Sequence, residues 1–243
     1  MWRSLSRTLR AFAHVGVIHR FLGYEPRSPQ RFWEGNHNRV DVKQGSEEFN
    51  AVADIFLEVP AVKSFYKPHV DRGAVDVARI ERIQNRALHD SLETGYGIVK
   101  SQLEKAGVAI QGGVHTRWLF HGTSKEVLDD IVEEGAQGFQ PLLNEKHIWG
   151  QGIYFARDSA YSWHSGWCND CIDKDGHKMI IMCLVSTGIP LVGEEEFKNM
   201  PKIHEDMRPR MRYHSFIDCP SNPEIFVVQK NDQVYPAYVI HFS

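Results

Sequence analysis

The sequence predicts an α+β fold in which helices pack on a largely antiparallel sheet. Short runs rich in β-branched and aromatic residues, each bounded by turn residues, dominate the second half of the chain. Amphipathic helical patterns fill much of the first half and interrupt those runs twice. Neither an internal repeat nor a low-complexity tract is present, so this alternation describes an ordinary globular domain.

The amino-acid composition limits the classes of protein to which the chain can belong. The chain has 243 residues with 42% hydrophobic and 24% charged residues, which suits one domain with at most a small attachment. Its net charge of −3 argues against binding to the phosphate backbone of nucleic acid. We expect no transmembrane segment, because no apolar run reaches the length of a membrane span. The four cysteines show no disulfide framework, which favours a reducing compartment, cytoplasmic or nuclear.

The first 28 residues differ from the rest. They carry several arginines, and apolar side chains recur at helical spacing in a stretch without acidic residues before Glu25. Such a segment is typical of a mitochondrial presequence, of a docking helix or of the cut end of a longer protein. A mitochondrial location is therefore kept as an alternative. We therefore predict a basic helix and linker over residues 1–28 and the main domain over residues 29–243.

Individual elements follow from periodicity and turn residues. Asn85 and Ser124 are expected to cap two of the helices. The last two strands are expected to pair as a hairpin. Helices are predicted at residues 47–63, 85–105, 124–134 and 158–165, and strands at 75–83, 117–121, 152–156, 178–186, 224–229 and 237–242.

Two motifs are candidates for chemistry. In the first, the apolar run Trp118–Phe120 ends in His121, Gly122 and Thr123, and a glycine there lets a ligand approach the backbone. In the second, Gly150 and Gly152 lead into a strand that carries Tyr154, and a helix with Ser162 and Ser165 follows. Each motif alone is more often an ordinary strand end or bulge than a binding site.

Taken together and in this order, the motifs resemble the poly(ADP-ribose) polymerase family, in particular its mono-ADP-ribosyl-transferring, diphtheria-toxin-like branch. The opening segments 29–33, 47–56 and 80–85 add to the resemblance. The resemblance implies an ADP-ribosyltransferase fold of two packed, largely antiparallel sheets with flanking helices. No room is left for the helical regulatory subdomain of the chain-forming members.

The resemblance also implies a substrate and a set of roles. NAD⁺ is the expected substrate, and a protein acceptor, the chain itself included, is the expected partner of a monomeric enzyme. His121 would hold the ribose 2′-hydroxyl, Gly122 and Ser162 the nicotinamide carboxamide, and Tyr154 the nicotinamide ring. Thr123, Gly152 and Ser165 complete the expected cofactor-binding set, and residues 139–150 would cover the cofactor.

The strand at residues 224–229 departs from the chain-forming members. They use a glutamate at the position that falls on Ile225 here, which gives a catalytic set of His121, Tyr154 and Ile225. A shift of one residue would instead place Glu224 at the site, because neighbouring strand residues face opposite ways. The Ile225 register predicts transfer of a single ADP-ribose unit and no polymer.

Ser165 is a second departure, because a tyrosine that stacks on nicotinamide occupies this position in the chain-forming members. Trp163, His164 and Trp167 are candidate substitutes for the lost ring. The alternatives to a protein mono-ADP-ribosyltransferase are a catalytically silent binding module, an NAD⁺ glycohydrolase and a transferase that acts on nucleic acid ends.

A cluster of metal-ligand residue types follows the pocket helix. His164, Cys168, Cys171 and His177 provide four nitrogen and sulfur ligands within a short polar loop, and a CxxC pair suits tetrahedral zinc. The tankyrase branch of the family carries a zinc loop in the corresponding region, with different spacing. We expect either a structural Zn²⁺ site or residues that are close by chance.

Overall fold

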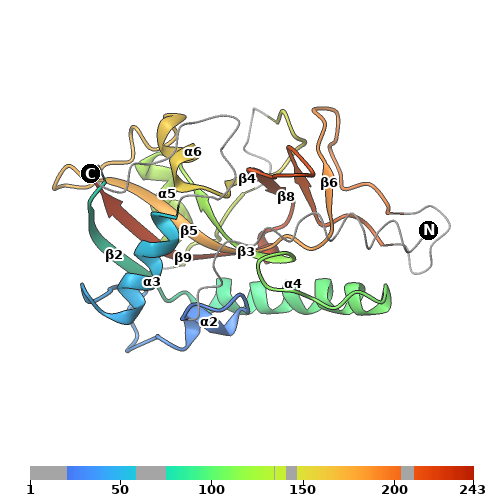
Figure 1. Cartoon of the computed structure of the whole chain (residues 1–243). Coiled ribbons are helices and arrows are strands. Elements are labelled where there is room, and N and C mark those ends of the chain that lie inside the picture. The colour runs from blue at the N-terminus through green and yellow to red at the C-terminus, as the bar shows by residue number, and fades with distance from the viewer. Residues whose placement is uncertain (1–20, 59–74, 134, 141–146, 204–210) are drawn as a thin grey trace.

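The computed structural model describes residues 21–58, 75–133, 135–140, 147–203 and 211–243 (Figure 1). Its helices are α2 (Arg27–Gln30), α3 (Glu47–Phe56), α4 (Arg86–Lys105), α5 (Lys125–Val132), α6 (Ser159–His164) and the 3₁₀ helix η2 (Asn231–Gln233). Its strands are β1 (Arg39–Asp41), β2 (Val77–Ile83), β3 (Thr116–His121), β4 (Ile153–Ala156), β5 (Lys178–Ser186), β6 (Pro190–Val192), β7 (Ser215–Ile217), β8 (Ile225–Val228) and β9 (Val234–Phe242).

The strands confirm the α+β class and the largely antiparallel sheet. Hydrogen bonds join nine described strands in the order β1-β2-β9-β5-β3-β4-β8-β7-β6, and only β6 and β7 pair in parallel among them. The expected two sheets are therefore connected into one. The connection between β3 and β4 rests on a single residue pair, Phe120 with Ala156. The sheet thus has two halves, β1-β2-β9-β5-β3 and β4-β8-β7-β6, which meet where the two motifs lie.

Helices form where the sequence supplies caps. Asn85 Oδ1 accepts the Leu88 N–H at 3.1 Å to begin α4, and Ser124 accepts the Val127 N–H at 3.4 Å to begin α5. α3 ends at Phe56, earlier than predicted, and the proline at position 60 disfavours a helix just before it. Figure 1 shows α4 along one side of the sheet and α6 on the other. No helix among the described residues is long and apolar enough to span a membrane.

Part of the predicted N-terminal region packs on the domain. Leu22 is fully buried, the Phe21 ring stacks on Phe32 at 5.2 Å, and Trp118 Nε1 donates to the Gly23 carbonyl at 3.2 Å. α2 runs across the predicted boundary between residues 28 and 29. The helix predicted further upstream lies in residues 1–20, outside the described residues, and the boundary itself stays a prediction.

The predicted terminal hairpin is wrong. β8 pairs with β4 and β7, whereas β9 pairs with β2 and β5, so the chain crosses from one half of the sheet to the other. Gln233 fixes this crossing, because its buried Nε2 donates to the carbonyls of Ser186 at 3.0 Å and His214 at 2.8 Å. β9 also begins earlier than predicted and runs through Pro236, which a register shift opposite Met182 and Cys183 accommodates.

Candidate functional site

His121, the last residue of β3, contacts the second motif directly. Its Nδ1 lies 2.8 Å from the carbonyl oxygen of Tyr154 on β4. A carbonyl can only accept, so Nδ1 carries the proton. In the neutral ring Nε2 is then a hydrogen-bond acceptor. The contact brings together two motifs that lie 33 residues apart in the sequence.

The surroundings of His121 favour its neutral form. Phe139 and Phe155 pack around the imidazole, with ring centroids at 5.0 and 5.6 Å. Burial lowers the pKa of His121, and the opposing effect of the hydrogen bond to Tyr154 is smaller. The ring therefore offers a fixed acceptor, Nε2.

Tyr154 holds the end of the predicted covering loop. Its hydroxyl accepts the Trp149 N–H at 3.0 Å and donates to the Gly150 carbonyl at 2.7 Å. Burial raises the pKa of Tyr154 to about 12, so the hydroxyl keeps its proton at neutral pH. The loop is thus anchored on both predicted site residues, with Phe139 on His121 and residues 149–150 on Tyr154. Its central part, residues 141–146, lies outside the described residues.

Gly122 is enclosed by the helix that carries the pocket serine. A Cβ added to Gly122 would lie 2.7 Å from Cys168 Sγ, 3.0 Å from Trp167 Cβ and 3.1 Å from Ser162 Cβ. Ser162 itself is buried on α6. The neighbouring Thr123 N–H bonds the Cys168 sulfur. The structure therefore brings His121, Gly122 and Ser162 together, as the sequence predicts.

Ile225 lies on the same face of its strand pair as Tyr154. The register pairs Ala156 with Ile225 and Tyr154 with Val227. Ile225 and Val227 form one apolar cluster against which Tyr154 packs, whereas Phe226 belongs to the main core. Because strand residues alternate, Glu224 shares the face of Phe226 and not that of Tyr154.

The other predicted cofactor residues are placed differently. A Cβ at Gly152 would lie 2.5 Å from the Val228 carbonyl oxygen, so this glycine serves the close pairing of β4 with β8. Ser165 ends α6, and its hydroxyl bonds the phenol of Tyr161. Trp163 packs edge-on against Phe242 at 5.6 Å, away from Gly122. Trp167, which is 53% exposed, is the aromatic candidate that begins beside Gly122.

The described side chains of the predicted zinc set are not grouped together. Cys168 and Cys171 are fully buried, and burial raises the pKa of each thiol to about 12. His177 turns its Nδ1 toward Asp173 at 3.3 Å, and no group of close ligand atoms among the described side chains unites it with the two cysteines. The side chain of His164 lies outside the described residues. The spacing suits zinc, but the loop directs His177 elsewhere.

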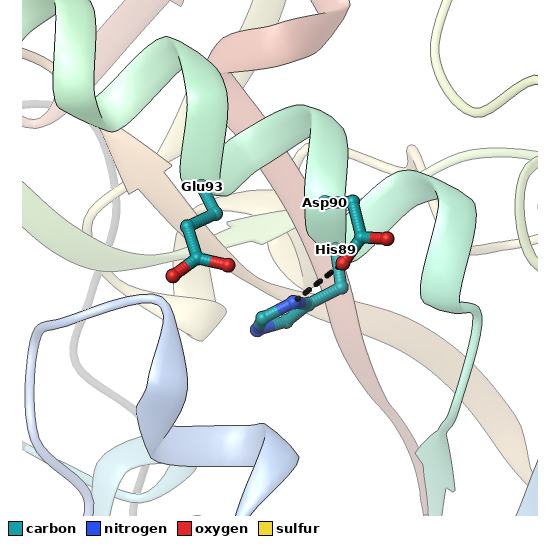
Figure 2. Close-up of side chains that lie close together, drawn as sticks. All are labelled: His89, Asp90 and Glu93. Carbon is teal, nitrogen blue, oxygen red and sulfur yellow. Dashed lines mark ion pairs between the residues drawn. The ribbon is translucent and has the colours of Figure 1, made fainter.

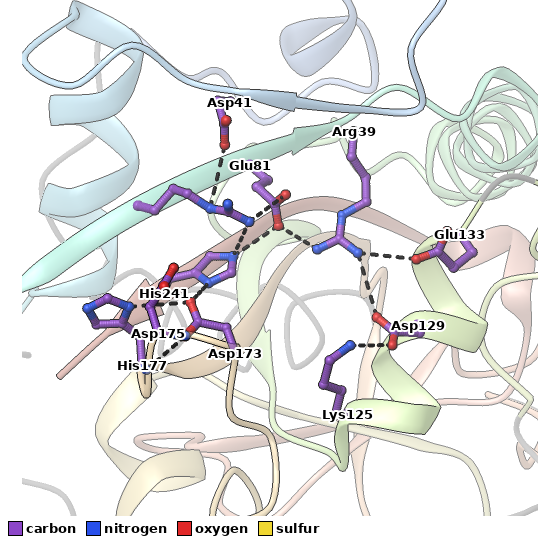
Figure 3. Close-up of polar contacts among 11 residues, drawn as sticks. Arg39, Asp41, Glu81, Lys125, Asp129, Glu133, Asp173, Asp175, His177 and His241 are labelled. Carbon is purple, nitrogen blue, oxygen red and sulfur yellow. Dashed lines mark hydrogen bonds and ion pairs between the residues drawn. The ribbon is translucent and has the colours of Figure 1, made fainter.

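Two other groups of described side chains have ligand atoms within 4.8 Å of one another. The first is His89, Asp90 and Glu93 on α4 (Figure 2). The second is Asp173, Asp175 and His177 in the loop after α6 (Figure 3).

Figure 3 shows that the second group belongs to a wider polar network. Asp173 accepts the His241 Nδ1–H at 2.7 Å, and the other ring nitrogen of His241 lies 2.9 Å from Glu81. Glu81 also accepts from Arg39 and Arg79. The loop that contributes Cys168 and Trp167 to the site is thereby tied to β9 and β2. Sequence reasoning missed this network, because its members lie far apart in the chain and no spacing links them.

Tyr161 and Arg157 were also missed. Tyr161 packs in the cluster of Ile225 and Tyr154, and burial raises its pKa. Arg157 joins the end of β4 to the approach of β8 through Asn222 Oδ1 at 2.5 Å. The only sequence signal for either residue is its place beside the Gly-x-Gly motif.

Comparison with known proteins agrees with this arrangement. The chain matches the family described as the poly(ADP-ribose) polymerase catalytic domain over residues 46–243. The PARP domain of Arabidopsis RADICAL-INDUCED CELL DEATH1 superposes with a TM-score of 0.53 at 20% identity, covering 70% of this chain and 89% of that one. This structural likeness supports the fold.

Curated relatives extend the match. The chain is 31% identical to mouse protein mono-ADP-ribosyltransferase PARP12 over 229 residues. This alignment covers 90% of this chain and 28% of the relative. The chain is 30% identical to mouse protein mono-ADP-ribosyltransferase PARP11, covering 84% of this chain and 60% of the relative. The chain thus spans less than two thirds of the length of these relatives. With the family match over most of its length, the chain belongs to the poly(ADP-ribose) polymerase catalytic-domain family.

Proposed function

We propose that this chain binds NAD⁺ and transfers one ADP-ribose unit to a protein acceptor, itself included, with release of nicotinamide. The observation that carries the proposal is the hydrogen bond from His121 Nδ1 to the Tyr154 carbonyl at 2.8 Å. It leaves Nε2 of a neutral ring as an acceptor, which is the form needed to take a hydrogen bond from a ribose hydroxyl.

The nicotinamide end has a matching site. An amide needs one donor and one acceptor, and the backbone of Gly122 supplies both where no side chain blocks the approach. Ser162, adjacent to Gly122, adds a hydroxyl to the same carboxamide. Tyr154, whose hydroxyl is committed to the loop, contributes the flat face of its ring.

The transfer reaction requires no strong acid or base from the protein. The bond between nicotinamide and the ribose anomeric carbon breaks with its electron pair passing to the ring nitrogen, so nicotinamide leaves as a neutral molecule. A carboxylate of the acceptor then forms the new carbon–oxygen bond without a proton to remove. Rigid positioning and exclusion of water are the main contributions required, and the buried rings around His121 provide them.

Ile225 limits the product in this proposal. Chain elongation uses a ribose hydroxyl as nucleophile, and a hydroxyl needs a base to accept its proton. The apolar side chain of Ile225 cannot accept a proton, and Glu224 lies on the opposite face by strand alternation. A single transferred unit is therefore the expected product.

One observation favours a second candidate, a silent binding module. Ser165 offers no ring to stack on nicotinamide, and its hydroxyl is engaged by Tyr161. Loss of that stacking weakens NAD⁺ binding by about 1 kcal/mol. Such a loss reduces affinity without removing the reaction, so we favour the enzyme.

The test is intact-protein mass spectrometry after incubation with NAD⁺, with released nicotinamide measured in parallel. The wild type should gain one or a few ADP-ribose increments, and a His121→Ala variant with an unchanged circular dichroism spectrum should gain none. Equal modification of both proteins would contradict the site. Folded wild type that neither gains mass nor releases nicotinamide would indicate the silent module.

A further inference from the structure

His89 is a buried histidine of α4 with one committed ring nitrogen. The side chain is fully buried, and Nε2 lies 2.6 Å from the Pro26 carbonyl oxygen. Since a carbonyl only accepts, Nε2 carries a proton, and in the neutral ring Nδ1 presents a lone pair. The rings of Trp33 and Tyr235 contact the imidazole edge-on at 5.3 and 5.4 Å, which fixes its orientation.

Among the described residues, none donates a hydrogen bond to the lone pair of Nδ1. Nδ1 is buried, and Asp90 Oδ1 lies 3.7 Å away. Glu93 is one helical turn further, and ligand atoms of all three residues lie within 4.8 Å of one another (Figure 2). A lone pair beside the Asp90 carboxylate is unfavourable unless positive charge lies between them.

We propose that His89, Asp90 and Glu93 bind a divalent transition-metal cation of the Zn²⁺ class. One imidazole nitrogen and two carboxylate oxygens suit this class, and water can complete the coordination. Ligand atoms around tetrahedral zinc are about 3.4 Å apart for bonds of about 2.1 Å, so the separation of Nδ1 from Asp90 already fits. Glu93 is half exposed, and its Oε1 lies 3.5 Å from Arg27 Nε, so a rotamer change that closes the remaining gap exchanges this exposed ion pair for the cation.

The other side of the imidazole fits the same interpretation. Metal-bound histidines regularly donate their second ring N–H to a carbonyl or carboxylate, which fixes the tautomer. His89 makes that bond to Pro26. A bound cation would therefore link α4 to the segment that leads into α2. None of these residues belongs to the proposed NAD⁺ site, so the two proposals are independent.

The Asp173 group lacks such a vacant ligand. Asp173 Oδ1 accepts the backbone N–H groups of Asp175 and His177, and Oδ2 contacts His177 and His241. Hydrogen bonds already use both of its oxygens. The α4 group differs because a buried nitrogen remains unused.

Isothermal titration of chelator-treated protein with ZnCl₂ tests the site. Other cysteines and histidines also bind zinc, so the comparison is between variants. Asp90→Asn/Glu93→Gln keeps size and removes both anionic ligands, and Glu104→Gln removes an exposed carboxylate from the same helix. Wild type and Glu104→Gln should share one binding event that is weakened at least tenfold in the double variant. Coincident titrations of all three proteins would overturn the proposal.

Nitrogen chemical shifts of the His89 ring give a second test. Before metal is added, Nδ1 should be unprotonated and Nε2 protonated, and Zn²⁺ should shift Nδ1 in the wild type but not in the double variant. A ring protonated at both nitrogens and unaffected by Zn²⁺ would identify a buried ion pair with Asp90 and refute the metal site.

Discussion

At the scale of single residues, the proposed site has Ser165 where the resemblance leads us to expect a stacking tyrosine, so another ring is needed to face nicotinamide. Trp163 is held against Phe242 and beneath Lys178. Trp167 is half exposed, and its Cβ lies 3.0 Å from the position that a Cβ on Gly122 would occupy. It is therefore the side chain free to cover a ligand bound at Gly122.

Replacing Trp167 tests this assignment. Trp167→Ala should raise the KM for NAD⁺ about fivefold, the equivalent of about 1 kcal/mol of lost ring stacking, with a smaller effect on kcat. Trp167→Phe should retain most of the affinity. Initial rates of nicotinamide release at varied NAD⁺ measure both constants. An unchanged KM for Trp167→Ala would exclude this ring from the site.

The absence of a side chain at Gly122 allows close packing of α6 and the following loop, and it also lets a ligand approach the backbone. Gly122→Ala forces its Cβ against Cys168, Trp167 and Ser162, and it should lower the free energy of unfolding by about 1–3 kcal/mol. Gly97→Ala is the matched control, since its Cβ meets nothing within 4 Å on helix α4. That change should raise stability by up to about 1 kcal/mol. Urea denaturation measures both, and equal effects would contradict the packing.

At the scale of elements, Gln233 connects the crossing between β8 and β9 to the carbonyls of Ser186 and His214. Gln233→Met removes the hydrogen bonds that the Gln233 side chain donates to two buried carbonyls, of Ser186 and His214. We expect a loss of about 2–4 kcal/mol in the free energy of unfolding. Gln44→Met, at an exposed position, should change stability by less than about 0.5 kcal/mol. Similar unfolding curves for the two variants would show that the crossing does not depend on Gln233.

The sequence predicted the elements that local chemistry controls. The caps Asn85 and Ser124 and the strand Lys178–Ser186 lie where the pattern placed them, because capping side chains and β-branched runs act on neighbouring residues. The three-residue strands β1, β6 and β7 carry too short a pattern to be recognised. The hairpin error arose because strands that are adjacent in sequence are not always adjacent in a sheet.

For the candidate site, as for the fold, the sequence indicated residues within motifs but not the contacts between distant segments. Motif order predicted His121, Gly122, Tyr154 and Ser162 as site residues, and the structure places His121 against Tyr154 and Gly122 against Ser162. The zinc set stays a prediction, because spacing does not reveal where His177 points, and the fold places Asp173 beside it. The tautomer of His121 likewise depends on a carbonyl 33 residues away.

At the scale of the whole molecule, two pairs of titratable groups make the free energy of unfolding depend on pH. In the first pair, His115 and His214, each Nδ1 accepts a backbone N–H, from Gln111 and Ile189. Protonation at Nδ1 would break these bonds, and burial lowers the pKa of both rings to about 4. In the second pair, partners among His241, Arg39 and backbone N–H groups outweigh burial and lower the pKa of Glu81 and Asp173 to about 2.

These shifts predict a stability that falls in two stages on acidification. Between pH 6.5 and about 4, His115 and His214 are protonated in the unfolded chain but remain neutral in the folded protein. The free energy of unfolding therefore declines over this range. From about pH 4.5 toward 2 the unfolded carboxyls of Glu81 and Asp173 protonate first, and the decline continues. Each of the four groups accounts for at most about 3 kcal/mol. Above pH 6.5 these four groups add no further slope.

Urea denaturation at pH 8, 5 and 3 separates the two stages. Glu81→Gln removes one of the two low-pH contributions, so it should reduce the loss between pH 5 and 3 while leaving the change between pH 8 and 5 as in the wild type. His214→Gln should reduce the loss between pH 8 and 5, because only the histidine pair titrates in that window, and it should reduce the loss between pH 5 and 3 by a smaller amount, because the folded ring stays neutral down to about pH 4. A free energy of unfolding that is the same at pH 8 and 5 would show that the two histidines are not held neutral in the folded state.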